Sequence, residues 1–445
     1  MSIAATSGVV SNIDYESLIT QLVNVKRQSI TQLETEKSTL ENKKSAYGTL
    51  NTAVTDLMSA ADDLKSADAF KVFTSTVSDE TILGATVGSS SSASKGTYSV
   101  TVNSIARSHK IAADGVASDT STVASGPGSF SFQAGAGAVQ TVSVDATTTL
   151  AGLKDAINGL NAGVTATLVN DGGATNPWRL ILTSDNTGTA NAVTITQNDT
   201  SLAFSTTLQA AQDASIMVDG LTFTRPSNTI TDIISGVTLD LKSSDPARTV
   251  TVGVDRDTAE ISKKLTALVD NYNAVISWIT SNNRYDTETK TAGAFFGETV
   301  ARSVWDDLRK VMQSSVSGLP DTMNRLLHVG ITTDKDGVMS LDSAKLDSAL
   351  SSDFDGVVKL FQDSATTKGF GGLVYDAANG ITDFADGRIT VKNEGLAKNI
   401  SYIEDDITRK ETEVNQYEEQ LRAQFTGLET MLAGLKNQQN YLSSL

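Results

Sequence analysis

The sequence contains no cysteine in 445 residues and only two histidines, His109 and His328. The absence of cysteine excludes disulfide bonds, thiolate nucleophiles and cysteine-ligated metal sites, although it does not indicate a compartment. With no cysteine to join them, a metal site or a catalytic triad built on either histidine is disfavoured against a structural role. We therefore expect no catalytic residue, no metal and no cofactor, and we expect both histidines to have structural roles.

Proline is also scarce, and it is absent from both ends of the chain. All five prolines lie between residues 127 and 320. Because proline removes a backbone donor and clashes with the preceding turn, it is the residue that most disrupts helices. The two ends of this sequence are therefore free to form long helices.

Neither a cleavable signal peptide nor a membrane span is evident in the sequence. The first basic residue is Lys26, and no apolar segment with a small-residue cleavage site precedes it. No run of about 18 apolar residues occurs anywhere. We expect a chain that is either cytosolic or exported by a route that needs no cleaved signal.

Negative charge exceeds positive charge by a wide margin. There are 52 Asp and Glu residues against 35 Lys and Arg residues, which gives a formal net charge of −17. This charge repels phosphate backbones and anionic headgroups, so we expect neither nucleic acid nor a membrane as a partner. The length exceeds what one hydrophobic core usually supports, and several domains are expected.

The C-terminal end carries an unbroken apolar repeat of seven residues. Its positions are Ile400, Ile407, Val414, Leu421, Leu428, Leu435 and Leu442. Such a spacing places the side chains along one seam and implies a left-handed supercoil with another helix. The second seam, from Ile403 to Leu445, alternates apolar and polar residues, which specifies register and partner number. The partner is either the other end of the chain or further copies of the same end.

The N-terminal end has a weaker form of the same pattern. Between Leu18 and Leu64, one frame of seven contains Leu33, Leu40, Tyr47 and Val54, and a second contains Leu50, Leu57 and Leu64. Charged residues fill much of the sequence between them. The pattern predicts one or two amphipathic helices, for which Ser11, Asn12 or Asp14 is available as the N-terminal cap.

The segment from 77 to 255 is rich in Thr, Ser, Val, Gly, Asn and Ala. Short alternating runs at 97–102, 141–144 and 164–169 predict β-strands, and one helix is expected at 150–160. After residue 255 the helical period returns, with a buried face from Ile261 to Ile279 and a further helix at about 300–312.

Three short elements are expected before the last helix. The segment 329–341 predicts a hairpin that turns at Asp336-Gly337, and 342–350 and 353–361 predict short capped helices. The aspartates at 334 and 336 are spaced as in a calcium loop, but the first and twelfth positions of such a loop are Thr332 and Ser343, so a hairpin is favoured. The glycines at 369–372 lack the Lys-Ser/Thr of a phosphate-binding loop and are interpreted as a flexible loop.

The order helix, β-rich segment, helix predicts an α+β multidomain fold. We expect a discontinuous helical stalk with terminal coiled-coil helices and two inserted β-rich head subdomains. The predicted divisions are 1–45 with 395–445 as terminal coiled-coil helices, 46–76 with 256–394 as a helical leg domain, 77–107 with 213–255 as an inner β head subdomain, and 108–212 as an inserted outer β head subdomain.

Four stretches of the sequence together resemble one known family. They are SGV at 7–9 with DYESLI at 14–19; ASIMVDG at 214–220 with SNTITD at 227–232 and GVTLDL at 236–241; LVDNYNAVI at 268–276; and QFTGLE at 424–429 with QQNYL at 438–442. In this order they resemble the bacterial flagellar filament cap family, the FliD group of hook-associated proteins. Residues 148–196 also resemble a repeat shared with other flagellar axial proteins.

The resemblance implies a non-enzymatic assembly protein. Family members form a ring at the distal tip of the filament, where they retain exported flagellin and promote its folding and polymerisation. The implied partners are further copies of the chain, with a pentamer favoured, together with flagellin, hook-filament junction proteins and an export chaperone on the C-terminal helix. The implied location is extracellular, at the flagellum tip, after export by the flagellar apparatus.

The expected contact residues for oligomerisation or for the filament lie in the terminal repeats. They are Leu18, Leu22, Leu33, Leu40, Ile400, Ile407, Val414, Leu421, Leu428, Leu435 and Leu442. Two other functions remain open at this stage. The Ser/Thr-rich head suits an adhesin for host surfaces or mucin, and another axial role, as a junction protein or a flagellin, is the related structural alternative.

Overall fold

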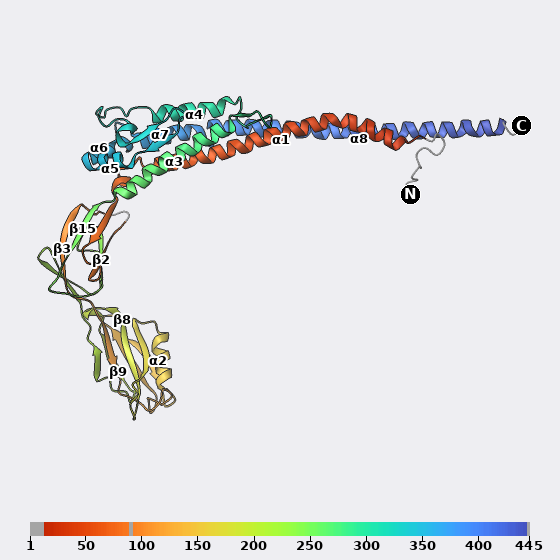
Figure 1. The fold of residues 1–445 in the computed structure, drawn as a ribbon. Coiled ribbons are helices and arrows are strands. Elements are labelled where there is room, and N and C mark those ends of the chain that lie inside the picture. Colours follow the sequence, from red (N-terminus) through yellow and green to blue (C-terminus); the bar gives the residue numbers. More distant parts are fainter. Residues whose placement is uncertain (1–12, 89–91, 443–445) are drawn as a thin grey trace. The chain divides into compact units, whose positions relative to one another are not determined.

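The structure is a computed structural model that describes residues 13–88 and 92–442. Contacts within the chain separate two compact units, the described parts of Met1–Phe70 with Ile261–Leu445 and those of Lys71–Glu260. The first unit is helical and the second consists mainly of antiparallel sheets (Figure 1). The α+β multidomain class is confirmed, while the finer division into four parts stays a prediction.

Seven α-helices make up most of the described part of the helical unit. They are α1 (Tyr15–Asp62), α3 (Thr258–Asn282), α4 (Thr299–Met312), α5 (Ser343–Ser352), α6 (Phe354–Phe361), α7 (Phe370–Thr382) and α8 (Arg388–Leu442). Short elements join them: the 3₁₀ turns η1 (Ala67–Phe70) and η3 (Leu326–Val329), and the hairpins β16 (Tyr285–Asp286) with β17 (Thr291–Ala292) and β18 (Ile331–Thr333) with β19 (Met339–Leu341). The two longest helices, α1 and α8, run alongside one another (Figure 1).

The long helix α1 begins at a side-chain cap. Oδ1 of Asp14 accepts a hydrogen bond from the backbone N–H of Ser17 at 3.0 Å, which satisfies one of the free donors of the first turn. The other two candidate caps, Ser11 and Asn12, lie outside the described residues. With no proline to interrupt it, the helix then continues for 48 residues.

The core of the helical unit includes one face of α1, which packs against α7, and one face of α3. Tyr47, Leu50, Val54 and Leu57 of α1 are fully buried. The face predicted for α3 is confirmed, because its seven residues from Ile261 to Ile279 are all buried. The indole N–H of Trp278 donates to the carbonyl of Ala46 at 3.0 Å and fixes α3 beside α1.

The predicted hairpin and short helices are also confirmed. β18 pairs with β19, and Oδ1 of Asp334 accepts from the backbone N–H groups of Asp336 and Val338 at 2.9 and 2.8 Å. This carboxylate is thus engaged in closing the turn. The side chains of Asp342 and Asp353 cap α5 and α6 by accepting from backbone N–H groups at 3.1 and 2.9 Å.

The interpretation of residues 369–372 as a flexible loop is wrong. Gly371 and Gly372 lie in the first turn of α7 and are buried. A Cβ on Gly371 would lie 2.7 Å from the backbone nitrogen of Lys65 and 2.8 Å from the carbonyl oxygen of Phe361. Glycine is required here because two backbone segments approach the helix more closely than any side chain allows.

Replacing Gly371 with alanine should therefore destabilise the helical unit by about 1–3 kcal/mol, since the obstructing atoms belong to the backbone and do not yield easily. Denaturant unfolding measures the effect. The control is Gly380→Ala, in the same helix but exposed and with no atom within 4 Å of the new Cβ. That substitution should stabilise the protein by roughly 0.5–1 kcal/mol. Equal effects of the two substitutions would contradict the close-packing explanation.

Two sheets with a shared apolar core make the inner β head. The larger has the order β1-β15-β3-β11-β12 and the smaller β13-β14-β2. The strands are β1 (Phe73–Val77), β2 (Leu83–Val87), β3 (Gly96–Ser104), β11 (Ala214–Val218), β12 (Leu221–Arg225), β13 (Thr229–Ile230), β14 (Val237–Leu241) and β15 (Thr249–Arg256). Asp219 and Gly220 both adopt positive φ, 48° and 85°, as a two-residue turn between β11 and β12 requires.

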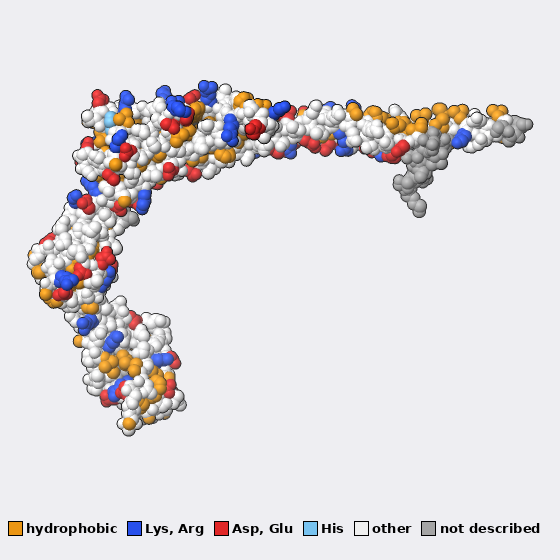
Figure 2. All heavy atoms as spheres, viewed as in Figure 1, with side chains coloured by type: hydrophobic (Ala, Val, Ile, Leu, Met, Phe, Trp, Pro, Cys, Tyr) orange, Lys and Arg blue, Asp and Glu red, His pale blue; other side chains and the backbone are white. Residues whose placement is uncertain are grey.

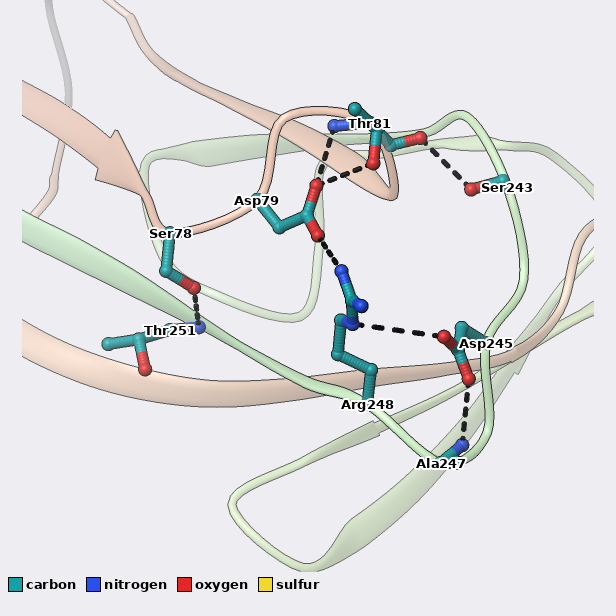
Figure 3. A network of polar contacts seen from close by, with 8 residues as sticks. All are labelled: Ser78, Asp79, Thr81, Ser243, Asp245, Ala247, Arg248 and Thr251. Atoms are coloured by element: carbon teal, nitrogen blue, oxygen red, sulfur yellow. Dashed lines mark hydrogen bonds and ion pairs between the residues drawn. The ribbon is translucent and has the colours of Figure 1, made fainter.

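A polar network closes one end of this inner head (Figure 3). Nη1 of Arg248 donates to Oδ2 of Asp79 at 2.5 Å, and its Nε lies 3.9 Å from Asp245. Hydrogen bonds from the Thr81 hydroxyl and from Arg248 lower the pKa of the Asp79 carboxyl. The network ties the loop before β15 to the turn between β1 and β2.

The outer β head is inserted between β3 and β11. Its sheets have the orders β10-β4-β8-β7 and β6-β5-β9. The elements are β4 (Ser108–Ala112), β5 (Gly128–Ala134), β6 (Gln140–Val144), α2 (Leu150–Gly159), β7 (Val164–Asn170), β8 (Trp178–Thr187), η2 (Thr189–Asn191), β9 (Val193–Asn198) and β10 (Thr206–Gln209). The helix expected at 150–160 is confirmed, and the hydroxyl of Thr149 caps it.

The chain enters and leaves the outer head at adjacent points. Arg107 and Gln212 form an isolated antiparallel bridge, with backbone N–H to carbonyl distances of 2.8 and 3.1 Å. Next to it, the side chain of Asn228 pairs with the backbone of Ala106 in both directions, at 2.6 and 3.0 Å. Asn228 lies in the segment SNTITD that carries part of the family resemblance, and it holds this crossing in place.

Candidate functional site

In the described part of the chain, each of the two histidines accepts a hydrogen bond from the backbone. Nδ1 of His109 accepts from the backbone N–H of Val193 at 3.0 Å, and Nδ1 of His328 accepts from that of Arg325 at 3.3 Å. Across residues 13–88 and 92–442, no cluster of three or more His, Asp or Glu side chains is suited to holding a metal ion. None of the helices described here has the length and apolar character that a membrane span requires.

The candidate site is the antiparallel pairing of α1 with α8, where the two apolar repeats meet. The ring of Tyr15 stacks on that of Phe425 at a centroid distance of 4.8 Å. Further along, the ammonium group of Lys26 lies 5.6 Å from the centre of the Tyr417 ring. The buried residues of this seam are Ile19, Val23 and Ile30 of α1 with Val414 and Leu421 of α8.

Ion pairs flank the apolar seam. Arg422 donates to Glu16 at 2.5 Å and to Glu418 at 3.0 Å, and Lys37 pairs with Glu404 at 2.7 Å. These side chains are about one-third to one-half exposed, so solvent screens each pair and its contribution to stability is small. The two ion pairs between the helices, Arg422 with Glu16 and Lys37 with Glu404, instead favour one register of α1 against α8.

The eleven predicted contact residues divide into three groups by exposure. Buried within the chain are Ile400, Val414 and Leu421. Partly buried are Leu33, Leu40 and Ile407. Between 41% and 71% exposed are Leu18, Leu22, Leu428, Leu435 and Leu442. The seven-residue repeat of α8 therefore faces α1 in its first part and has large exposed side chains in its last part.

Sequence reasoning missed the α1 residues that pack against α8 most closely. These are Tyr15, Ile19, Val23 and Ile30. A signal was present, because the frame of Leu33 and Leu40 continues backwards in steps of seven to Ile19. Lys26 interrupts that frame, and the contact of its exposed side chain with the Tyr417 ring is not visible in the sequence.

Two exposed apolar stripes remain on the terminal helices. The α1 stripe, defined as Leu18, Leu22 and Val25, lies about a quarter turn from the face that contacts α8. The tail stripe, defined as Leu428, Met431, Leu435 and Leu442, continues the seam of α8 beyond Phe425. Figure 2 shows hydrophobic side chains along the edge of the slender part that ends at the C-terminus. Exposed apolar stripes of this kind are typical of surfaces that bind another chain.

A second cluster, centred on Glu298, joins three helices of the same unit. Its carboxylate accepts from Lys43 of α1 at 2.8 Å and from Lys392 of α8 at 2.7 Å, and the Tyr47 hydroxyl lies 3.3 Å away. The Glu298 side chain is only 13% exposed. Burial alone raises the pKa of this carboxyl, but the hydrogen bonds from Lys392 and Lys43 outweigh it and hold the pKa below its ordinary value. Glu298 is thus ionised and anchors α1 and α8 next to the start of α4.

Comparison with known proteins assigns the family. A family model described as the flagellar hook-associated protein 2 C-terminus matches residues 211–437, and the model for its N-terminus matches residues 11–109. The chain belongs to the flagellar hook-associated protein 2 family. A third model, the flagellin hook IN motif, matches residues 129–186, which overlaps the repeat expected at 148–196 but begins and ends earlier.

Relatives in the flagellar hook-associated protein 2 family cover most of this chain. The B-type protein of Pseudomonas aeruginosa is 30% identical over 409 residues, which are 84% of each chain. The protein of Escherichia coli K12 is 28% identical over 470 aligned positions that cover all of this chain and 98% of its own. Among solved structures, the flagellar cap protein FliD D1-D2-D3 domains from Escherichia coli match with a TM-score of 0.64, 27% identity and coverage of 79% of this chain and 99% of that one.

Proposed function

We propose that this chain is a flagellar filament cap, which forms a ring at the distal tip, retains exported flagellin and promotes its folding and polymerisation. The observation that carries the proposal is the tail stripe, an apolar continuation of the α1–α8 seam whose large side chains remain exposed. A helix with such a stripe gains stability only by packing against another chain. Membership of the flagellar hook-associated protein 2 family supports the filament and its subunits as those chains.

The contact residues then have two separate roles. The buried group, Ile400, Val414 and Leu421, joins the two ends of one subunit into a paired shaft. The exposed group, Leu18 and Leu22 with Leu428, Leu435 and Leu442, contacts neighbouring copies or the filament end. We further propose a pentameric ring, contact with hook-filament junction proteins, and export by the flagellar apparatus to the extracellular tip with a chaperone on α8. No step of this function breaks or forms a covalent bond.

The double variant Leu428→Asp with Leu435→Asp tests the proposal. Two charges on the tail stripe should prevent its contacts, because burying an unpaired carboxylate is strongly unfavourable. In a strain that lacks its own cap protein, this variant should be exported and folded, yet filament growth should fall at least about 10-fold and flagellin should appear in the medium. Filament length and secreted flagellin are the measurements.

The matched control adds the same two charges to the other side of the helix. Thr430 and Asn437 are exposed and lie roughly half a turn away from Leu428 and Leu435. The variant Thr430→Asp with Asn437→Asp should support filaments of normal length. Normal growth with the stripe variant, or equal failure of both variants, would refute the role given to the tail stripe.

A further inference from the structure

The tail stripe contains one methionine, Met431, whose side chain is 66% exposed. Every other methionine that the structure describes is better protected from solvent. Met312, Met323 and Met339 are at most 9% exposed, and Met58 and Met217 are partly buried, while Met1 lies outside the described residues. Because a thioether reacts only with an oxidant that reaches it, the sulfur of Met431 is the most accessible one in the described chain.

Two glycines leave one side of Met431 open. On the surface of a helix, the neighbours of a residue are those three and four positions away. On one side of Met431 these are Leu428 and Leu435 of the tail stripe, and on the other side they are Gly427 and Gly434. A Cβ placed on either glycine would have no atom of the described residues within 4 Å. The sulfur is therefore next to apolar side chains on one side and to unobstructed backbone on the other.

Methionine at this position adds a chemical reaction that leucine lacks. Leucine would supply a similar apolar surface, but the thioether sulfur also has a lone pair that attacks one oxygen of hydrogen peroxide. An S–O bond forms and the O–O bond breaks, and the departing hydroxide takes the proton of the transferred hydroxyl and leaves as water. The sulfur is oxidised to the sulfoxide and the peroxide is reduced, so no further reactant is needed.

The product changes the character of the stripe. Methionine sulfoxide is polar, and its oxygen accepts hydrogen bonds. At position 431 this group stands beside Leu428 and Leu435. When another chain covers the stripe, the oxygen loses its water, and burying an acceptor without a donor is unfavourable. Oxidation thus weakens binding by the stripe, while the buried seam around Val414 and Leu421 lies further back along α8 and is unaffected.

We propose that Met431 is a site of oxidation by hydrogen peroxide, and that its sulfoxide stops the tail stripe from binding another chain. The inference rests on the proposed function, in which the tail stripe contacts neighbouring copies or the filament end. It adds a chemical switch to that surface, because one oxygen atom on one side chain decides whether the stripe is apolar throughout. A subunit that is oxidised before assembly then fails to cap.

Peptide mass spectrometry tests the chemistry. Purified full-length chain is exposed to increasing concentrations of hydrogen peroxide and is then digested. The sulfoxide of Met431 should form about 10-fold faster, or more, than that of Met312 or Met339, because those two side chains are buried. Oxidation of Met431 at the same rate as these buried methionines, or more slowly, would overturn the proposal.

Filament length in a strain that lacks its own cap protein tests the consequence. Met431→Gln places a polar group of similar length on the stripe and should lower filament growth about 10-fold, whereas Met431→Leu should support normal filaments. At a peroxide concentration that oxidises Met431 in the wild-type chain, growth with wild type should fall about 10-fold and growth with Met431→Leu should continue. Equal losses with the two chains, or normal growth with Met431→Gln, would show that the proposed switch is wrong.

The variant Leu428→Asp with Leu435→Asp separates failure of this inference from failure of the proposed function. If that variant fails to support filaments while Met431→Gln supports them normally, the oxidation switch is wrong and the function stands. If both variants support normal filaments, the role given to the tail stripe is itself wrong. Loss of filaments with both variants, together with normal growth of Met431→Leu under peroxide, supports the function and the switch.

Discussion

Val414→Asp is expected to separate the first part of α1 from α8, with a loss of about 3 kcal/mol or more in the stability of that pairing. Val414 is 2% exposed and lies in the small cluster with Ile19, Val23, Ile30 and Leu421. An ionised carboxylate placed there has no cation to pair with inside the seam, so it must either take up a proton or draw water between the helices. Only five buried residues hold this part of the two helices together, so the free-energy cost of burying the carboxylate should exceed the stability that their packing provides.

Hydrogen exchange measures the result at the level of single segments. In Val414→Asp, the backbone amides of α1 from Tyr15 to Ile30 should lose protection, while those of the core around Leu50 should keep it. Gln416→Asp, two residues further along α8 at an exposed position, provides the matched control and should leave exchange unaltered. Full protection of α1 in the Val414 variant would show that α8 is not its partner.

Glu298→Gln should cause the second large loss, about 1–3 kcal/mol at neutral pH. The substitution keeps the shape of the side chain but removes the charge that Lys43 and Lys392 share, and it leaves two partly buried ammonium groups without a counterion. Urea unfolding followed by circular dichroism measures the difference. The comparison is Glu404→Gln, which disrupts the solvent-screened ion pair with Lys37 and should change stability much less than Glu298→Gln does.

The Glu298 effect should depend on pH in a defined direction. The folded-state pKa of this carboxyl lies below its ordinary value of 4.5, so its contribution is complete above that pH. As the pH falls below 4.5 and through the folded-state pKa, Glu298 takes up a proton and the contribution is lost. The stability gap between wild type and Glu298→Gln should therefore narrow under acid conditions. A gap that stays constant from pH 7 to pH 3 would exclude the charge as its cause.

Long periodic patterns were the most predictable part of this fold. The seven-residue repeat of α8, the buried face of α3 and the aspartate caps of α5 and α6 all follow from local spacing, and each is present in the structure. Local spacing is informative in these cases because one helix face or one capping side chain determines the outcome. The turn at Asp336-Gly337 was predictable for the same reason.

Features set by distant parts of the chain were not predictable. Nothing near Gly371 in the sequence reveals that the backbone of Lys65 will pack against it. The Glu298 cluster likewise collects Lys43, Tyr47 and Lys392 from segments separated by hundreds of residues. The contact residues of the α1–α8 pairing could be predicted only in part. Which side chains of α8 meet α1, and which extend beyond it, depends on the register between the two helices, and the sequence pattern does not determine that register.

Because Arg107 and Gln212 are paired, the outer head begins and ends at neighbouring points of the backbone. Directly bridged residues in an antiparallel ladder have their Cα atoms about 5 Å apart, so the inner sheet presents two neighbouring chain ends to whatever is spliced between them. A different domain whose own termini lie close together could be inserted at this point without changing β3 or β11. The residues between Arg107 and Gln212 can therefore change in length and sequence while the strands β3 and β11 keep their hydrogen bonding.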